Sequence, residues 1–105
     1  MDEAAKQRES EIKAMLKEQL RLAGPILRGR RTFLFGSRAT GNAHPRSDFD
    51  VGVIGDEPLP LRDFYAIEDM LDALPTPYKI DWVDFNWVSD EFRQRAMHTM
   101  ETLYE

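Results

Sequence analysis

The 105-residue chain contains no cysteine, so disulfides and thiolate metal sites are excluded. No run approaches the roughly 18 consecutive apolar residues that a membrane-spanning helix needs. The first residues, 1–6, lack the apolar stretch of a secretory signal, and we expect a cytoplasmic protein. The Gly-x-x-x-x-Gly-Lys-Ser/Thr loop that cradles phosphates in one large group of proteins is also absent.

The charge balance is acidic, because 19 Asp and Glu residues against 14 Lys and Arg give a formal net charge of −5. This balance argues against direct nucleic-acid binding, since the phosphate backbone attracts basic surfaces. An acidic chain still binds a triphosphate when cations bridge the two. The apolar fraction of 42% and the charged fraction of 31% are ordinary for a globular protein. The length predicts one domain over residues 1–105.

The hydrophobic pattern predicts a small α/β (α+β) fold, with a mixed β-sheet and helices packed on one face. Helices are expected over residues 2–23, 60–74 and 89–103. Strands are expected over residues 32–35, 48–54 and 78–85. Residues 37–47 are expected to form a polar loop, with or without one helical turn. The apolar face of the last helix is assigned to Phe92, Ala96, Met100 and Leu103. The core of the fold would then span residues 32–105.

Two aspartates stand at the start of the second expected strand, in Asp48-Phe49-Asp50. Residues two apart in a strand face the same side, with Cα atoms roughly 6.5–7 Å apart. Their carboxylates can therefore converge on one magnesium ion or bridge two. Acidic pairs on solvated strands are common, and the pair alone identifies no metal site. This pair, however, opens a Phe- and Val-rich strand, where like charges repel each other unless a cation neutralises them.

A third carboxylate, Asp81, interrupts the last expected strand. If that strand lies beside the second one, Asp81 reaches the same ions and serves as a metal ligand or as a general base. Asp84 is the competing candidate, but its opposite parity predicts that it faces the other side of the sheet. Parity favours Asp81 if the active face is the one away from Ile80 and Trp82.

Gly36-Ser37 closes the first expected strand, ten residues before the aspartate pair. A glycine there frees φ and lets the backbone approach a ligand closely. The adjacent amides and the Ser37 hydroxyl can cradle phosphate oxygens; the alternative is a plain turn at the end of a strand. Arg38 and Arg46 either neutralise triphosphate charge or are solvated surface side chains, and the sequence leaves both open.

With these residues the chain resembles the minimal nucleotidyltransferases of the DNA polymerase β-like superfamily. Their signature is Gly-Ser, ten residues, Asp-x-Asp and a third acidic residue on a later strand. Gly36-Ser37, Asp48-x-Asp50 and Asp81 match this signature in spacing and order. The combined spacing is a fairly specific signal, whereas each part alone is weak.

The resemblance covers the chain from about Thr32 to residue 105, and Arg38, Gly41 and Ser47 also fit the family pattern. Phe49 departs from it, because that position is often aliphatic. The resemblance implies a nucleotidyltransferase fold. Together with the charge of the two arginines, it makes Gly36, Ser37, Arg38, Arg46 and Ser47 the expected nucleotide contacts.

The same resemblance implies transfer of a nucleoside monophosphate, AMP from ATP or from another nucleoside triphosphate. Asp48, Asp50 and Asp81 would be both the catalytic residues and the ligands of two Mg²⁺ ions, and Mn²⁺ also suits carboxylate sites. Minimal members lack the second domain that holds the acceptor in larger relatives. They pair with a helical HEPN-domain protein, so the expected acceptor is a tyrosine of a HEPN toxin and the chain would be the antitoxin.

Three other interpretations stay open. The chain is a non-catalytic antitoxin that covers its partner, or one subunit of a two-part transferase acting on a small molecule. In the third, it is an α/β domain whose strands carry acidic residues incidentally. The oligomeric state is open as well, because the helix over 2–23 either packs on the sheet or extends into a contact between copies.

Overall fold

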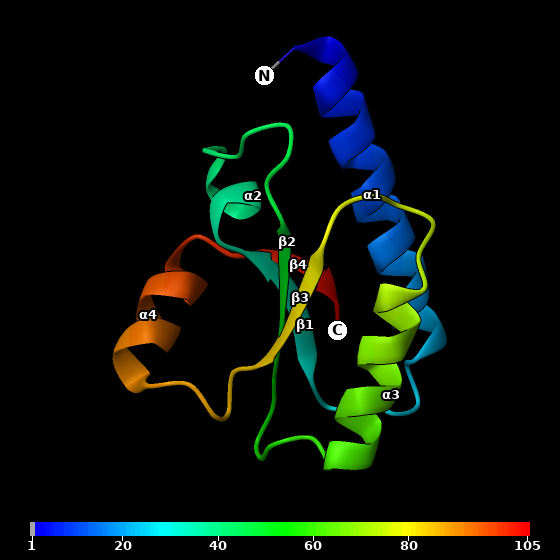
Figure 1. The fold of residues 1–105 in the computed structure, drawn as a ribbon. Coiled ribbons are helices and arrows are strands. Elements are labelled where there is room, and N and C mark those ends of the chain that lie inside the picture. The colour runs from blue at the N-terminus through cyan, green and yellow to red at the C-terminus, as the bar shows by residue number, and fades with distance from the viewer. Residues whose placement is uncertain (1) are drawn as a thin grey trace.

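A computed structural model describes residues 2–105 and shows a four-stranded mixed sheet flanked by helices (Figure 1). The helices are α1 (Glu3–Leu22), α2 (Ser37–Thr40), α3 (Leu61–Asp72) and α4 (Asp90–His98). The strands are β1 (Arg31–Phe35), β2 (Phe49–Ile54), β3 (Ile80–Asp84) and β4 (Glu101–Tyr104). Within residues 2–105, no helix has both the length and the apolar character needed to cross a membrane.

The strand order in the sheet is β3-β2-β1-β4. Strand β1 runs antiparallel to both of its neighbours, whereas β2 and β3 are parallel. Parallel neighbours cannot be joined by a tight turn, and α3 supplies the crossover between them. The paired positions of β2 and β3 include Asp50 with Asp81. The topology therefore brings together two carboxylates that lie far apart in the sequence.

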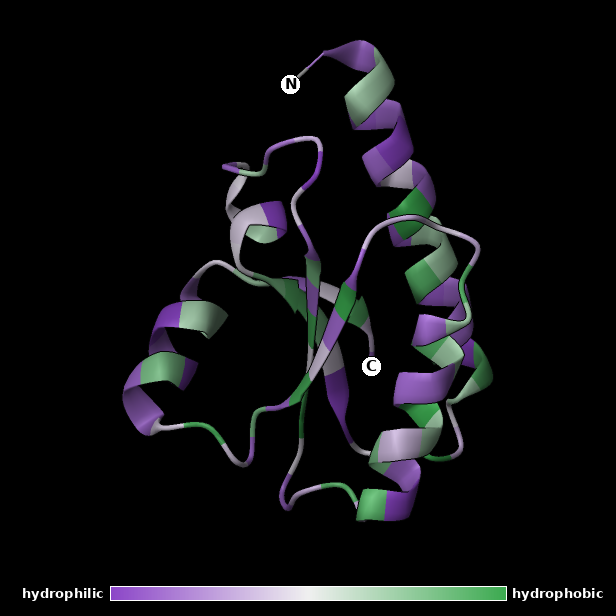
Figure 2. Cartoon of the chain, in the orientation of Figure 1, coloured by the Kyte–Doolittle hydropathy of each residue, from purple (hydrophilic) through white to green (hydrophobic). Residues whose placement is uncertain are grey.

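Helix α1 forms where the sequence predicts it. The Asp2 side chain accepts a hydrogen bond from the backbone N–H of Ala5 at 2.7 Å and caps the first turn. Ile12, Leu16 and Leu20 recur at helical spacing and are buried against the sheet. Figure 2 shows hydrophobic residues interspersed with hydrophilic ones along this helix. Of the two roles left open for it, packing on the sheet is the one observed.

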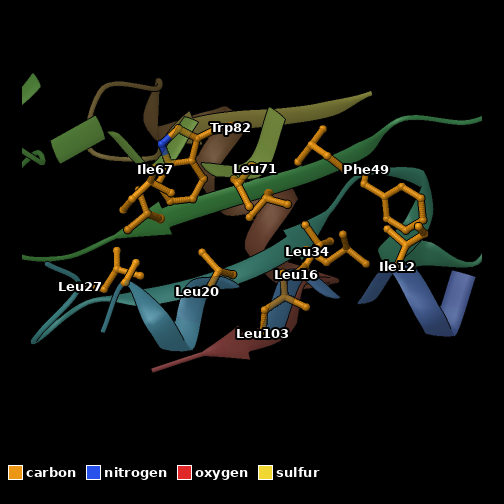
Figure 3. Packing of buried hydrophobic residues seen from close by; sticks show 14 of the residues in the cluster. Ile12, Leu16, Leu20, Leu27, Leu34, Phe49, Ile67, Leu71, Trp82 and Leu103 are labelled. Atoms are coloured by element: carbon orange, nitrogen blue, oxygen red, sulfur yellow. The ribbon is translucent and has the colours of Figure 1, made fainter. Parts of the chain in front are cut away.

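The main core lies between the sheet and the two longest helices, α1 and α3, on what we call the closed face. Leu34 of β1, Phe49 of β2 and Trp82 of β3 point into it, and Ile67 and Leu71 of α3 meet them (Figure 3). Strand alternation explains the arrangement, because every second residue of a strand faces the same side. Val51 and Val53 of β2 are buried in the same core, as this alternation requires.

The opposite face of the sheet, which we call the open face, carries a smaller cluster of Phe33, Phe35 and Phe85. Helix α4 lies over it, with Ala96 and Met97 packed against the three rings. The α/β fold class is confirmed, but the expectation that all helices share one face is corrected, since α4 lies on the other side of the sheet (Figure 1). No residue of α4 is buried, so this cover is partial.

The fourth strand is absent from the sequence prediction, which extended the last helix to residue 103. The helix ends at His98, and β4 pairs antiparallel with β1. Leu103 is buried in the main core, and the Thr32 hydroxyl donates a hydrogen bond to the Tyr104 carbonyl at 2.9 Å. The helix-like spacing is outweighed by pairing with the edge of β1, a tertiary contact that local periodicity does not reveal.

Candidate active site

The site is built around Asp50 on β2 and Asp81 on β3, which are register partners in the parallel pair. Both line a cavity on the open face. Lys79 is the cation beside them, with its Nζ 3.3 Å from Asp81 Oδ1, but its side chain is 71% exposed. Solvent screens such an ion pair, so the two carboxylates are only weakly neutralised.

Burial raises the pKa of Asp50 from its ordinary value of 3.8 to about 6. The negative charge of Asp81, a hydrogen bond shared with Asp81 and the charge of Asp48 act in the same direction, and Lys79 opposes them. The ionised form of Asp50 is therefore disfavoured in the protein alone. A bound cation would reverse this, because an opposite charge favours the ionised form.

The cavity has a volume of about 520 Å³, within the range of small-molecule sites. Gly36 and Thr40 form one wall, and Phe92 and Arg95 of α4 form another together with Thr99, which follows the helix. Arg95 and Thr99 were not among the site residues predicted from the sequence. Arg95 follows Phe92 by three residues, a spacing that places both side chains on one side of a helix but does not tell which face of the sheet that helix covers.

Gly36 is required at this position by two independent features. Its φ of 71° is a conformation that L-residues rarely adopt, and an added Cβ would collide with Oδ2 of Asp50. It is also the N-cap of α2, whose first intrahelical bonds run from Ala39 and Thr40 to the Gly36 carbonyl. The amides of Ser37 and Arg38 precede these bonds, at the end of the helix where N–H groups are left for a ligand.

The Arg38 side chain is not brought to the cavity. Its guanidinium is buried, lies 2.8 Å from Glu9 Oε2 of α1 and donates to the Ser47 carbonyl at 2.7 Å. It also stacks on the Phe49 ring, 4.2 Å from the centroid, and lies over Tyr78. These contacts tie α1 to the loop before β2, so Arg38 holds in place the segment that carries Asp48.

Three further predicted site residues lie beside the cavity rather than in it. Arg46 and Asp48 are exposed and line a neighbouring hollow with Lys79. The Ser47 hydroxyl accepts a hydrogen bond from the His44 amide at 2.8 Å. The structure thus gathers Gly36, Asp50 and Asp81, and leaves Asp48 at the rim.

Asp84, the competing third carboxylate, faces the closed side as its parity predicts. It is buried, and its two oxygens accept hydrogen bonds from the Leu59 amide at 2.8 Å and the Asn86 amide at 2.9 Å. These bonds fix the loop before α3 and the turn after β3. Asp84 therefore has a structural role and cannot meet the Asp50 side chain.

The carboxylate pair fits a divalent cation of the magnesium type. Within residues 2–105, no three Asp, Glu or His side chains lie close enough together to enclose a metal ion by themselves. Magnesium does not need such a cage, because it commonly takes one or two carboxylates and completes its shell with phosphate oxygens and water. Asp50 and Asp81 offer that partial, hard-oxygen set.

Residues 25–105 match the polymerase beta nucleotidyltransferase family, so the chain belongs to that family. A protein of Haemophilus influenzae, named as a probable protein adenylyltransferase MntA, is 36% identical over 63 residues. This match covers 57% of the chain and 53% of the relative, so it spans about half of the relative's length.

Solved structures share the fold. A crystal structure of a toxin–antitoxin with AMP-PNP superposes with a TM-score of 0.66 at 25% identity, covering 88% of this chain and 72% of that one. The structure of a tri-AMPylated Shewanella oneidensis HEPN toxin in complex with MNT antitoxin gives a TM-score of 0.64 at 20% identity. The second likeness covers 91% of this chain and 71% of that one, and it shows the fold alone.

Proposed function

We propose that this chain is a metal-dependent nucleotidyltransferase that moves AMP from ATP to a hydroxyl group of an acceptor protein. The observation that carries the proposal is the register pairing of Asp50 with Asp81 in a cavity of about 520 Å³. Membership of the family supports the reaction class. The name of the Haemophilus influenzae relative supports ATP as donor and a protein as acceptor.

Asp50 and Asp81, with Asp48 at the rim, would hold the metal, which we propose to be two Mg²⁺ ions or Mn²⁺ in their place. When bound, the metal supplies Lewis-acid stabilisation of the attacking and leaving oxygens. The side chains themselves orient the substrate. Gly36 and Ser37 would contact the β- and γ-phosphates through backbone amides at the start of α2.

The remaining walls of the cavity suit the rest of the nucleotide. Arg95 is a cation of α4 facing the acidic pair across the cavity, and we assign it to the phosphate charge. The Phe92 ring, 37% exposed, offers apolar surface to a base. Arg46 and Ser47 remain predicted contacts from the neighbouring hollow. Arg38 acts by positioning the loop before β2 rather than by touching phosphate.

The proposed reaction is an in-line displacement at the α-phosphorus. The acceptor hydroxyl oxygen forms a bond to that phosphorus, and the bond to the oxygen bridging the α- and β-phosphates breaks. Pyrophosphate leaves, and Asp81 accepts the hydroxyl proton as general base. Because Asp81 lies on the edge strand of the sheet, an acceptor can approach it from outside the domain.

The similar structures suggest the partner. They include toxin–antitoxin complexes, one of them with an AMPylated HEPN toxin. We propose that a helical HEPN toxin is the partner, that one of its tyrosines receives AMP, and that this chain is thereby an antitoxin. A reaction fed by ATP would take place in the cytoplasm.

The test is a transfer assay with α-labelled ATP, Mg²⁺ and a co-purified HEPN partner. Label should appear on the partner, disappear with Asp50→Asn, and persist with Asp56→Asn, an exposed aspartate outside the cavity. A stable complex without label would favour the non-catalytic antitoxin. Label on a small molecule in the absence of any protein acceptor would favour the two-part transferase.

A further inference from the structure

A second hollow, which we call the edge groove, runs along the outer side of β3 and has a volume of about 280 Å³. Its walls are mostly apolar and include Leu61 and Tyr65 of α3 and Trp87 after β3. These three side chains are 64%, 55% and 72% exposed. Large apolar side chains gathered at an open surface indicate a place where another molecule binds.

The groove borders an edge strand, and Trp82 is the position on it that a further strand could pair with, because the outward Asp84 carbonyl already accepts from the Trp87 amide at 3.1 Å. Strand β3 is the outermost strand on its side of the sheet and crosses in front of β2 in Figure 1. The Lys79 carbonyl accepts from the Phe49 amide at 2.9 Å, and the Phe85 amide donates to the Val53 carbonyl at 2.8 Å. Alternate residues of a parallel strand face the same neighbour. The N–H and C=O of Trp82 therefore point away from β2.

The edge groove lies next to the acidic cavity, because Val83 lines both. Strand β3 lies between the two hollows, and its side chains alternate between the two faces of the sheet. Trp82 faces the closed side, whereas Asp81 and Val83 face the open side. A strand added beside β3 would follow the same alternation. One of its side chains would enter the edge groove, and the next would lie beside Asp81.

We propose that an extended segment of the acceptor protein pairs with β3 as a fifth strand. Its apolar side chain fills the edge groove, and the adjacent hydroxyl side chain is presented to Asp81. The inference rests on the proposed function and names how that site receives its acceptor. Side chains opposite each other on neighbouring strands have Cβ atoms about 4.5–5.5 Å apart, which is within reach of the general base.

Charge favours an acceptor segment over a second copy of this chain. Pairing two copies through β3 would bring a second Asp50 and Asp81 pair to the same seam, and like charges across strands destabilise the pairing. A segment with hydroxyl and apolar side chains adds no such charge. Lysine side chains at its ends would favour it further, since the chain carries a net charge of −5.

The first experiment uses the whole protein and a synthetic peptide, acetyl-Lys-Thr-Leu-Tyr-Leu-Thr-Lys-amide. Two variants of the peptide carry one N-methyl group on adjacent amides around the tyrosine, so that only one of them loses a hydrogen bond to β3. Binding should slow hydrogen exchange at the Trp82 amide by about tenfold or more at saturation. Only one N-methyl variant should retain this effect. Equal behaviour of both variants, or an unprotected Trp82, would overturn strand addition.

The second experiment measures transfer of label from ATP to the same peptide. Trp87→Ala and Tyr65→Ala should each raise the KM for the peptide about tenfold and change kcat by less than about twofold. Leu22→Ala is the matched control, because Leu22 is an exposed leucine, 56% accessible, on the far helix α1. Groove variants that behave like the control would overturn the assignment of the groove.

The outcomes separate this inference from the proposed function. Label on a HEPN partner, with Trp82 unprotected and Trp87→Ala unchanged, would overturn the edge groove and leave the function standing. Trp82 protection without label on any acceptor would support strand addition and count against the proposed function. A concentration-dependent dimer that protects Trp82 without peptide would overturn the acceptor as the occupant in favour of a second copy.

Discussion

The two faces of the sheet differ in almost every physical respect. The closed face is sealed by α1 and α3, and Leu16, Leu34 and Ile67 there have essentially no exposed surface. The open face has three aromatic rings, the acidic pair and α4, a helix without a single buried residue. Stability is concentrated on one face, so the other is free to hold carboxylates that cost stability.

Gly52 shows how the open face accommodates both rings and carboxylates. It follows Asp50 by two residues and faces the same side, and an added Cβ would lie 2.7 Å from the rings of Phe33 and Phe85. The rings therefore lie across the bare backbone of β2 and support the strand next to Asp50. The open face is therefore tightly packed next to Asp50, and this packing fixes the position of the Asp50 carboxylate.

The largest expected effect comes from Asp50→Asn on the open face. Transfer should fall by about 10³-fold or more, because the amide is a poor ligand for magnesium and the neutral side chain stabilises no charge. Thermal unfolding should show a protein at least as stable as wild type, since a buried repulsion is removed. Activity near the wild-type level would contradict the assignment of this face.

Leu16→Ala is the corresponding substitution on the closed face, and we expect it to change stability rather than activity. It should lower the free energy of unfolding by about 3 kcal/mol, because a fully buried leucine leaves a cavity. Denaturant titration measures the loss, and Leu22→Ala should lose less than about 0.5 kcal/mol. The folded fraction of Leu16→Ala should transfer AMP at the normal rate. A catalytic defect in that fraction would show that the faces are not independent.

Gly36→Ala should reduce transfer about 100-fold, because the new methyl group displaces the Asp50 carboxylate and a misplaced group costs about this much. Gly29→Ala is the control. Its φ of 77° imposes a similar backbone strain, but nothing lies within 4 Å of the added atom. An equal loss of transfer in the two variants would mean that backbone strain, rather than contact with Asp50, explains why a glycine occupies position 36.

The smallest effect is a pH dependence of stability without metal. The pKa of Asp50 is raised from 3.8 to about 6, so the folded state holds more protons than the unfolded state between these values. Stability should therefore fall as pH rises through this window. After discounting for partial exposure, wild type should lose about 1 kcal/mol or less relative to Asp50→Asn between pH 5 and pH 7.5 in EDTA. Mg²⁺ should restore most of that difference, as thermal unfolding can show.

Much of the site was predictable because strand parity is a local property. Alternation placed Asp50 and Asp81 on one side and Asp84 on the other, and the structure agrees. The burial of Arg38 was not predictable, since its ion pair is with Glu9, 29 residues earlier in the chain. Arg95 and Thr99 line the cavity because α4 lies on the open face, which the apolar periodicity of that helix does not specify.

Strand β4 was also not predictable from local sequence, because it depends on a contact with a distant part of the chain. Residues 101–104 continue a helical spacing, and their pairing with β1 joins positions some 70 residues apart. Local propensity predicts a strand poorly when the strand forms because it pairs with the free edge of a neighbouring strand.

The parallel pairing of β2 with β3 also sets an order of events during synthesis. Strands β1 and β2 can pair as soon as both have been synthesised, because only the short segment between Phe35 and Phe49 separates them. The carboxylate of β3 arrives 31 residues after that of β2, and it joins its partner only once α3 has folded as the crossover. A chain that has been made only as far as α3 therefore holds half of the acidic pair, and the wall that α4 adds to the cavity follows later still.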